Sequence, residues 1–334
     1  MTSSCKILCW FSVLASALLL HAGSRIPASA QDAKTQTPPA DEARILLTAV
    51  DKDGHFVNTL RADDLRILED GTAQEITTFH QITDRTASLA ILIDASGSQE
   101  RTLPAQKLAA TSFVDTIIRP DRDEAAVATF TGTLTVEQTL TNNVALLREA
   151  IARAKFVPPP GYVRGGLVIG PPPPPSRSPA ALASATAIWD SVIAACNDLL
   201  SNSSGQTRRA IILMTDGIDT ISKSKMAAAV DRANQANVAV YCIGIGDAEV
   251  FGLEKDPLRK LSERTGGRAF FPKKIGDLAT IFAEIGQELR TQYLIVYSPT
   301  RTAGTAGKIK VELVNPVLRK SKVQLYHQQT VPRK

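Results

Sequence analysis

The chain has 334 residues, of which 44% are hydrophobic and 21% are charged, a composition typical of a globular protein with an ordinary core. Its formal net charge is +5, and removing Lys6 and Arg25 with a predicted leader lowers it to +3. Such a small basic surplus argues against nucleic acid or an anionic membrane surface as a partner.

The first 30 residues have the pattern of a secretory signal peptide. Lys6 supplies the positive start, an apolar segment follows at residues 7–20, and Ala28-Ser29-Ala30 provides the small residues that precede cleavage. The apolar segment is shorter than the about 20 residues that span a bilayer, so we expect cleavage near Ala30 and not an uncleaved anchor. Since no other long apolar run follows, the sequence predicts an exported protein, periplasmic or secreted, without a transmembrane segment.

Both ends of the mature chain are predicted to be rich in β-strands. Residues 31–41 are polar and contain two prolines, which indicates a linker. Short segments of alternating apolar and polar residues then predict an N-terminal β module at 42–85 and a C-terminal β segment at 291–330. We expect these two regions to pair with one another in one small accessory layer.

Between them, residues 86–290 alternate between strand and helix patterns. This alternation predicts an α/β fold with a doubly wound, mostly parallel sheet. A proline- and glycine-rich insert at 157–179 interrupts it, and its proline runs favour an extended polyproline II form. The insert is interpreted either as a solvated loop or as an arm that contacts a partner. The expected strands are 89–94, 125–130, 133–140, 210–215, 238–244 and 268–271, and the first expected helices are 103–118 and 143–155. We expect the strands at 125–130 and 133–140 to form a hairpin through Thr131-Gly132, and Asn143 to cap the second helix.

Oxygen-bearing side chains follow two of the buried strands. Asp94, Ser96 and Ser98 come directly after the first strand, and Asp216 follows the strand at 210–215. Thr186 lies at the expected start of a helix. The carboxyl ends of the strands are where ligands bind in an open α/β sheet. Carboxylates and hydroxyls without His or Cys suit Mg²⁺ or Ca²⁺ better than zinc, so we predict a divalent-cation site here.

Together these residues resemble the metal-ion-dependent adhesion site of a von Willebrand factor type A domain. Residues 266–271 also resemble the last core strand of such domains. The flanking segments at 50–54, 68–71 and 289–297 resemble a bacterial subfamily of exported proteins related to these domains, best known from acidobacteria. The resemblance covers nearly all of the mature chain, and it implies a Rossmann-like fold of the von Willebrand type.

The resemblance also implies a role for each site residue. Ser96 and Ser98 would ligate the cation through their hydroxyls, and Thr186 would bind it directly or through water. Asp94 and Asp216 would act directly or through waters. Mg²⁺, or Ca²⁺ or Mn²⁺ in its place, would keep one position open for an Asp or Glu of a partner protein. The implied function is protein–protein interaction of the cell-adhesion type.

Two positions depart from the usual pattern of these domains. Gln99 stands where Met is usual, which we expect to alter the packing above the first helix without removing a ligand. Ser184-Ala185 replaces the usual Gly-Gly or Thr-Gly before the Thr186 helix.

Two other functions remain open alternatives. One is a structural envelope component in which the cation only staples the fold. The other is a Mg²⁺-dependent phosphohydrolase with Asp94 as nucleophile. Such enzymes commonly carry a second Asp two residues later, where this chain has Ser96, and Gly244-x-Gly246 is an incomplete nucleotide motif. We therefore expect no enzymatic activity.

Several other reactive or charged residues are given structural interpretations. Cys196 and Cys242 are predicted to be small buried residues, with a disulfide between them left open. Asp190 and Asp219 lie near the site in sequence and are interpreted as solvated charges.

Overall fold

The computed structural model describes residues 42–156, 162–163, 167–168, 185–203, 207–246, 252–299 and 307–331. The predicted leader at 1–30, the linker at 31–41 and most of the insert at 157–179 lie outside these residues. The polyproline form expected for the insert therefore stays a prediction.

A six-stranded sheet in the order β12-β11-β10-β5-β6-β7 forms the centre of the α/β region. All neighbouring strands are parallel except β7, which returns beside β6 in the hairpin that the sequence predicts. The doubly wound, mostly parallel sheet is thus confirmed. Its strands are β5 (Ala87–Asp94), β6 (Glu124–Phe130), β7 (Leu134–Thr141), β10 (Arg208–Thr215), β11 (Val238–Gly244) and β12 (Ala269–Phe270).

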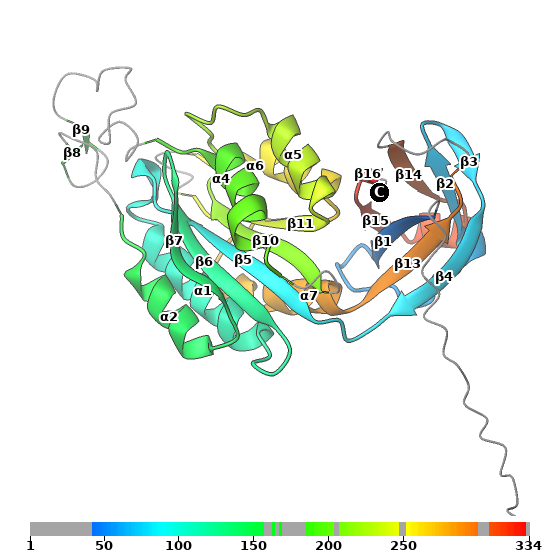
Figure 1. The fold of residues 1–334 in the computed structure, drawn as a ribbon, viewed down its shortest axis with the longest axis horizontal. Coiled ribbons are helices and arrows are strands. Elements are labelled where there is room, and N and C mark those ends of the chain that lie inside the picture. The colour runs from blue at the N-terminus through cyan, green and yellow to red at the C-terminus, as the bar shows by residue number, and fades with distance from the viewer. Residues whose placement is uncertain are drawn as a thin grey trace, which may run out of the picture. The chain divides into compact units, whose positions relative to one another are not determined.

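Helices of the described chain cover both faces of this sheet (Figure 1). One face carries α1 (Leu103–Ile117), α2 (Val144–Arg153) and α7 (Leu278–Arg290). The other carries α4 (Ile188–Ala194), α5 (Met226–Gln235) and α6 (Lys255–Arg264).

The strand β5 shows why the sheet needs two covered faces. All eight of its residues are buried. Because side chains alternate along a strand, Leu89, Ile91 and Ile93 enter the hydrophobic core on the α1 side. Ala90 and Leu92 enter the core on the α4 side. A continuous apolar run is therefore the pattern that this central position requires.

The two ends of the chain pair as expected, but they form two sheets and not one layer. The first sheet has the order β15-β1-β13-β4 and the second has the order β16-β14-β2-β3. In the first, Ile45 pairs with Ile295, and in the second, Ile67 pairs with Val311. The apolar faces of both sheets contribute to one shared core, so a single layer would have left one of these faces exposed. The strands are β1 (Ala43–Val50), β2 (Leu65–Glu69), β3 (Thr72–Gln74), β4 (Ile76–Ile82), β13 (Gln292–Tyr297), β14 (Gly307–Leu313), β15 (Gln324–His327) and β16 (Thr330–Val331).

Several short elements complete the described chain. A helix that the sequence analysis did not predict, α8 (Pro316–Lys320), begins at Asn315, whose Oδ1 accepts the backbone N–H groups of Val317 and Leu318. Two-residue strands β8 (Tyr162–Val163) and β9 (Leu167–Val168) pair within the insert. Single turns occur at η1 (Ala62–Asp64), η2 (Gly97–Gln99), η3 (Ala195–Leu199, a π-helical turn) and η4 (Ile275–Asp277).

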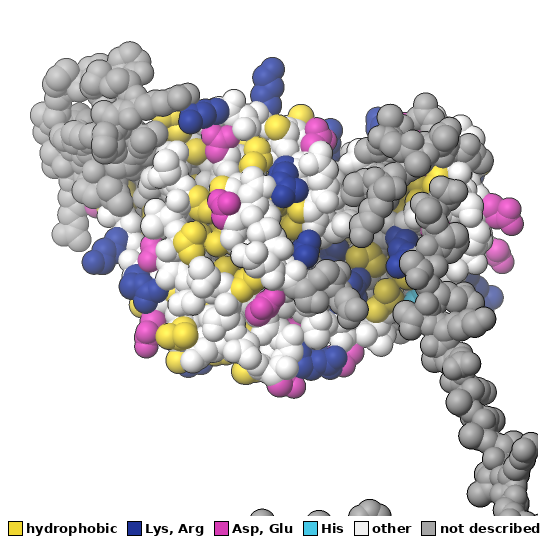
Figure 2. Space-filling model, viewed as in Figure 1, with side chains coloured by type: hydrophobic (Ala, Val, Ile, Leu, Met, Phe, Trp, Pro, Cys, Tyr) yellow, Lys and Arg dark blue, Asp and Glu magenta, His cyan; other side chains and the backbone are white. Residues whose placement is uncertain are grey.

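The mixture of charges on the surface fits the small net charge of the chain, and the two described cysteines are buried as predicted. On the face shown in Figure 2, Lys and Arg are interspersed with Asp and Glu, without a large area of one sign. Cys196 and Cys242 are both buried free thiols, so the structure contains no bridge between them. Burial raises the pKa of each thiol to about 12, which makes both poor nucleophiles. Within the described ranges, no helix is long and apolar enough to cross a membrane.

Candidate metal centre

The predicted site lies where the two innermost strands of the six-stranded sheet end. β5 and β10 are parallel neighbours, with Ile93 beside Met214 in the register, so Asp94 and Thr215 end the strands side by side. Ser96 and Ser98 follow Asp94 in the turn η2, and Asp216 follows Thr215 directly. We call this edge, formed by residues 94–99 and 215–217, the crest.

Hydrogen bonds through side chains and one backbone N–H connect the four residues Asp94, Ser96, Ser98 and Asp216. The Ser98 hydroxyl donates to Asp216 Oδ2 at 2.6 Å, and the Ser96 and Ser98 hydroxyl oxygens lie 3.4 Å apart. Asp94 Oδ1 accepts the Ser96 N–H at 3.0 Å. Asp94 Oδ2 accepts the Thr215 hydroxyl at 2.6 Å. Residues more than a hundred positions apart in the chain therefore converge on one point.

The turn after Asp216 depends on a glycine. Gly217 has a φ of +85°, and a Cβ there would lie 2.4 Å from the backbone oxygen of Glu254. The close approach lets the Glu254 N–H donate to the backbone carbonyl oxygen of Asp216 at 2.8 Å, which attaches the start of α6 to the crest. The Asp-Gly pair is thus a fixed turn that aims the Asp216 side chain at Ser98.

The two carboxylates of the crest carry an uncompensated charge. Asp94 is fully buried, and burial together with the neighbouring Asp216 raises its pKa to about 7. Burial also raises the pKa of Asp216, against the hydrogen bond from Ser98. Among the described residues, no basic side chain forms an ion pair with either carboxylate. A pair of buried acids without a counter-charge is the electrostatic setting that a divalent cation relieves.

Thr186 lies in a loop that is hydrogen-bonded to the segments following β6 and β10, but its hydroxyl has no described hydrogen bond to the other four predicted ligands. The neighbouring Ala187 N–H donates to the Thr131 oxygen, just beyond β6, and β6 pairs with β5 up to Asp94. The Thr186 N–H donates to the Thr220 hydroxyl at 2.8 Å. Thr186 thus lies between the segment that follows β6 and the segment that follows β10. Its residue is buried, and its hydroxyl has no described hydrogen bond to Asp94, Ser96, Ser98 or Asp216.

Asp190 and Asp219 hold the Thr186 loop in place and are not the solvated charges that we expected. Asp219 Oδ1 accepts the Ile188 N–H at 2.7 Å at the start of α4. The Asp190 carboxylate accepts the backbone N–H groups of Lys223 and Ser224. Although burial opposes it, these hydrogen bonds lower the pKa of Asp190.

Gln99 is the site residue that the sequence analysis missed. Its side chain is fully buried, and its Nε2 donates to Asp216 Oδ2 at 2.6 Å and to Ser98 Oγ at 3.1 Å. The departure from Met at this position was noted only for its effect on packing. A polar residue at a position otherwise apolar, one residue after a predicted ligand, is the signal that would have found it.

The donor set fits a hard cation held by hydroxyls as well as carboxylates. The described residues contain no cluster of three His, Cys, Asp or Glu side chains, so two carboxylates alone cannot surround an ion. Ser96 and Ser98 add oxygens to the same point, and the partial exposure of Ser98 leaves one side of the crest accessible. Mg²⁺ accepts such a mixture of oxygens together with waters.

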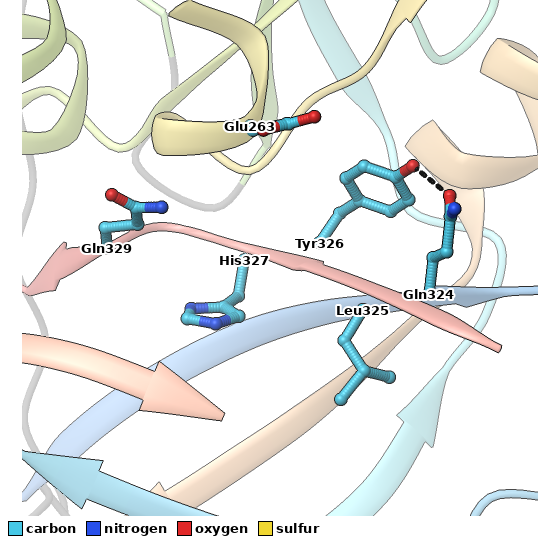
Figure 3. A pocket seen from close by; sticks show the side chains of 6 residues that line it. All are labelled: Glu263, Gln324, Leu325, Tyr326, His327 and Gln329. Atoms are coloured by element: carbon cyan, nitrogen blue, oxygen red, sulfur yellow. Dashed lines mark hydrogen bonds between the residues drawn. The ribbon is translucent and has the colours of Figure 1, made fainter. Parts of the chain in front are cut away.

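A separate cavity of 260 Å³ lies away from the crest, between β15 and the last turn of α6 (Figure 3). Gln324 and Tyr326 lie on one side of the strand, where the Tyr326 hydroxyl donates to Gln324 Oε1, and Leu325 and His327 point to the other side. Glu263 reaches it from α6, whose first turn contacts Asp216. Because α6 has ten residues and is about 15 Å long, the cavity lies at the opposite end of this helix from the crest. Its lining does not contribute to the cation site.

Comparison with known proteins agrees with this fold. Residues 179–284 match a family model described as the von Willebrand factor type A domain. The matched segment contains Thr186 and Asp216 and begins after Asp94, Ser96 and Ser98. The chain thus resembles this family over residues 179–284, a segment that includes β10, β11 and the helices α4, α5 and α6 of the doubly wound sheet. No curated protein matches the chain.

Three solved structures illustrate the likeness, which at these identities concerns the fold alone. Proximal thread matrix protein 1 from the mussel byssus is 18% identical with a TM-score of 0.49, over 66% of this chain and 51% of that one. A second structure of that protein is described as having a zinc-occupied metal-ion-dependent adhesion motif; it is 19% identical with a TM-score of 0.48, over 64% and 49%. A von Willebrand factor type A protein from Catenulispora acidiphila is 14% identical with a TM-score of 0.47, over 80% and 75%. The chain spans about half the length of the mussel protein.

Proposed function

We propose that this protein binds one divalent cation at the crest and uses it to recognise a carboxylate of a partner protein. The observation that supports this most strongly is the convergence of Asp94, Ser96, Ser98 and Asp216. Two of these residues are buried carboxylates without an ion-pair partner among the described residues. We include Thr186 as a further ligand, bound directly or through water.

The charge of the site explains why it would bind a partner. Two carboxylates neutralise a divalent cation, and the neutral hydroxyls of Ser96 and Ser98 leave the cation attractive to one more anion. The partly exposed side of Ser98 gives that anion access to the crest. An Asp or Glu side chain of another protein has the required charge and geometry. Mg²⁺ is our first choice of ion, with Ca²⁺ and Mn²⁺ as alternatives, since every donor is a hard oxygen.

The proposal is recognition without catalysis. Asp94 is fully buried, and each of its oxygens accepts a hydrogen bond, one from the Ser96 N–H and the other from the Thr215 hydroxyl, so the carboxylate is held away from solvent. These contacts disfavour an attack by Asp94 on a phosphoryl group. We also propose that the protein works outside the cytoplasm, because the first 30 residues have the pattern of a cleaved signal peptide.

Water-proton relaxation with Mn²⁺ as the probe tests this function. A bound Mn²⁺ with an open position enhances the relaxation of exchanging water, and millimolar acetate should reduce that enhancement by replacing a water ligand. Acetamide, which has the same shape and no charge, should leave the enhancement unchanged. The Ser96→Ala plus Ser98→Ala variant should show no enhancement.

Two results would point to the alternatives. If Mn²⁺ raises the unfolding temperature but acetate does not change the relaxation, the cation is a staple of the fold. If the protein hydrolyses p-nitrophenyl phosphate and Asp94→Asn abolishes the turnover, the site is that of an enzyme.

A further inference from the structure

A buried polar network lies behind the crest and contacts Asp216 through Gln99. Gln99 belongs to η2, and its amide Nε2 is 2.6 Å from Asp216 Oδ2. The residue is fully buried, so the amide cannot exchange this partner for bulk water without opening the turn. A buried amide donor facing a buried carboxylate is a strong, charge-assisted contact.

The orientation of the Gln99 amide is fixed from the other side. Its Oε1 accepts the Thr102 hydroxyl and also the Gln106 Nε2, the latter at 2.6 Å. Gln106 is itself fully buried in α1. Because two donors hold the amide oxygen, the NH₂ group must face Asp216. A rotated amide would place its oxygen against the Asp216 carboxylate and its NH₂ group against the Gln106 NH₂ group, which mismatches both contacts.

The hydrogen bonds to Asp216 leave its two oxygens in different states. Oδ2 accepts both the Ser98 hydroxyl and the Gln99 amide, each at 2.6 Å. Among the described contacts, Oδ1 accepts one hydrogen bond, from the Ile218 N–H at 3.0 Å. Since each carboxylate oxygen offers about two lone-pair sites, Oδ2 is saturated and Oδ1 keeps one site free.

We propose that Gln99 is a positioning residue that takes the place of the cation when the site is empty of metal. The fixed positive end of its amide compensates Asp216 and keeps the crest assembled without a cation. It also prevents Asp216 Oδ2 from ligating, so Asp216 acts through Oδ1 or through a bound water. This inference rests on the cation site of the proposed function.

A thermodynamic consequence separates this role from ordinary packing. If Gln99 compensates Asp216 mainly in the metal-free protein, its loss destabilises the metal-free protein more than the loaded one. By linkage, the same difference appears as tighter cation binding. Loss of a residue that only fills space would destabilise the metal-free and the metal-loaded protein equally.

The test compares Gln99→Met with a matched control, Gln292→Met, which removes an equally buried amide from β13, where its described hydrogen bond is to Thr48. Thermal unfolding is followed in EDTA and in saturating Mg²⁺ at equal ionic strength, and the Mg²⁺ affinity is measured by calorimetry. We expect Gln99→Met to lower the unfolding temperature by several degrees more in EDTA than in Mg²⁺, and to tighten Mg²⁺ binding about 3- to 10-fold. Gln292→Met should lower the unfolding temperature similarly in both conditions and bind Mg²⁺ like the native protein.

Other outcomes contradict the proposal in distinguishable ways. An equal loss in EDTA and Mg²⁺, or an unchanged or weaker Mg²⁺ affinity of Gln99→Met, would assign Gln99 to packing alone. If the native protein takes up no cation, the proposed function fails, and this inference fails with it. If Gln99→Met does not fold in either condition, Thr102→Val, which removes one of the two bonds that orient the amide, is measured in the same way, with the same sign expected and the same contrary results.

Discussion

The two ends of the six-stranded sheet treat their buried aspartates in opposite ways. At the amino end, Asp123 is nearly as buried as Asp94 is at the crest. Arg119 Nε lies 2.8 Å from Asp123 Oδ2, and Arg290 lies 3.9 Å from the same oxygen. Burial alone would raise the pKa of Asp123, but the hydrogen bonds from Arg119 lower it. At the crest, where the described residues supply no basic partner, the pKa of Asp94 is raised to about 7.

Burial by itself therefore does not mark a functional acid, since Asp123 and Asp94 are both buried but their pKa values shift in opposite directions. The chain neutralises Asp123 with its own guanidinium groups, and Asp123 also accepts the Ala87 N–H at the start of β5. That arrangement stabilises the fold and needs nothing from outside. The crest instead surrounds two acids with hydroxyls and N–H groups, which donate hydrogen bonds to the carboxylates but carry no full positive charge. The missing counter-charge, more than the burial, points to an external ion.

The largest expected effect is the loss of cation binding when a crest acid is neutralised. Asp216→Asn should weaken Mg²⁺ binding by about 100-fold or more, because it removes one of the two charges that attract the ion. Calorimetric titration measures this directly. Asp123→Asn serves as the matched control at the other end of the sheet and should bind Mg²⁺ as the native protein does. Equal weakening by both variants would contradict the distinction between the two ends.

For stability we expect the reverse order, with a larger loss in Asp123→Asn than in Asp216→Asn. Asp123→Asn removes a buried anionic partner of Arg119, which keeps its ion pair with Asp84, and should lower the free energy of unfolding by about 1.5–3 kcal/mol. Asp216→Asn should lower it far less in EDTA, since the lost carboxylate has no cationic partner there among the described residues. Urea unfolding of both variants in EDTA gives the comparison, and a larger loss for Asp216→Asn would contradict it.

The pH dependence of stability should also differ between the two ends. The raised pKa of Asp94 means that the metal-free folded protein holds a proton that the unfolded chain has released. Its contribution to stability is therefore complete below about pH 4 and is lost as the pH rises to about 7. The lowered pKa of Asp123 acts in the other direction, since its contribution is present above the unfolded value of 3.8 and is lost as the pH falls.

Urea unfolding in EDTA between pH 5 and pH 8 separates the crest from the amino end. The native protein should lose stability over this range, and Asp94→Asn should show a flatter profile. Added Mg²⁺ should remove the decline, because the cation replaces the proton. Parallel profiles for the native protein and Asp94→Asn would mean that Asp94 titrates normally.

The smallest effect is expected from a surface ion pair that belongs to neither end. Arg148 Nε lies 2.7 Å from Asp115 Oδ1, between α2 and α1, and both side chains are exposed. Arg148→Ala should change the free energy of unfolding by about 0.2–1 kcal/mol and leave the Mg²⁺ affinity unchanged. A larger loss in urea unfolding would mean that the α1–α2 contact depends on this pair.

The sequence was most informative where the fold leaves little choice. A continuous apolar run such as residues 89–93 has to be a central strand, and the carboxyl ends of parallel neighbours have to share one edge. Asp94 and Asp216 could therefore be placed together before the structure was known. The hairpin of β6 and β7 and the cap of α2 at Asn143 followed from local patterns in the same way.

What the sequence did not reveal depends on contacts between distant segments. The alternation of residues in the terminal strands does not encode which strand lies beside which, so two sheets were expected as one layer. Gln99 reaches Asp216 only because η2 turns its side chain back toward β10. The helix α8 is different, since Asn315 and Pro316 form an ordinary start signal that was overlooked.

Calorimetric titration of the mature protein with Mg²⁺, Mn²⁺ and Ca²⁺, beside the Ser96→Ala plus Ser98→Ala variant, shows whether the crest binds a cation. We expect saturable uptake of one ion by the native protein and its loss in the variant, with both proteins folded. No uptake by the native protein, or equal uptake by the variant, would contradict a cation site at the crest.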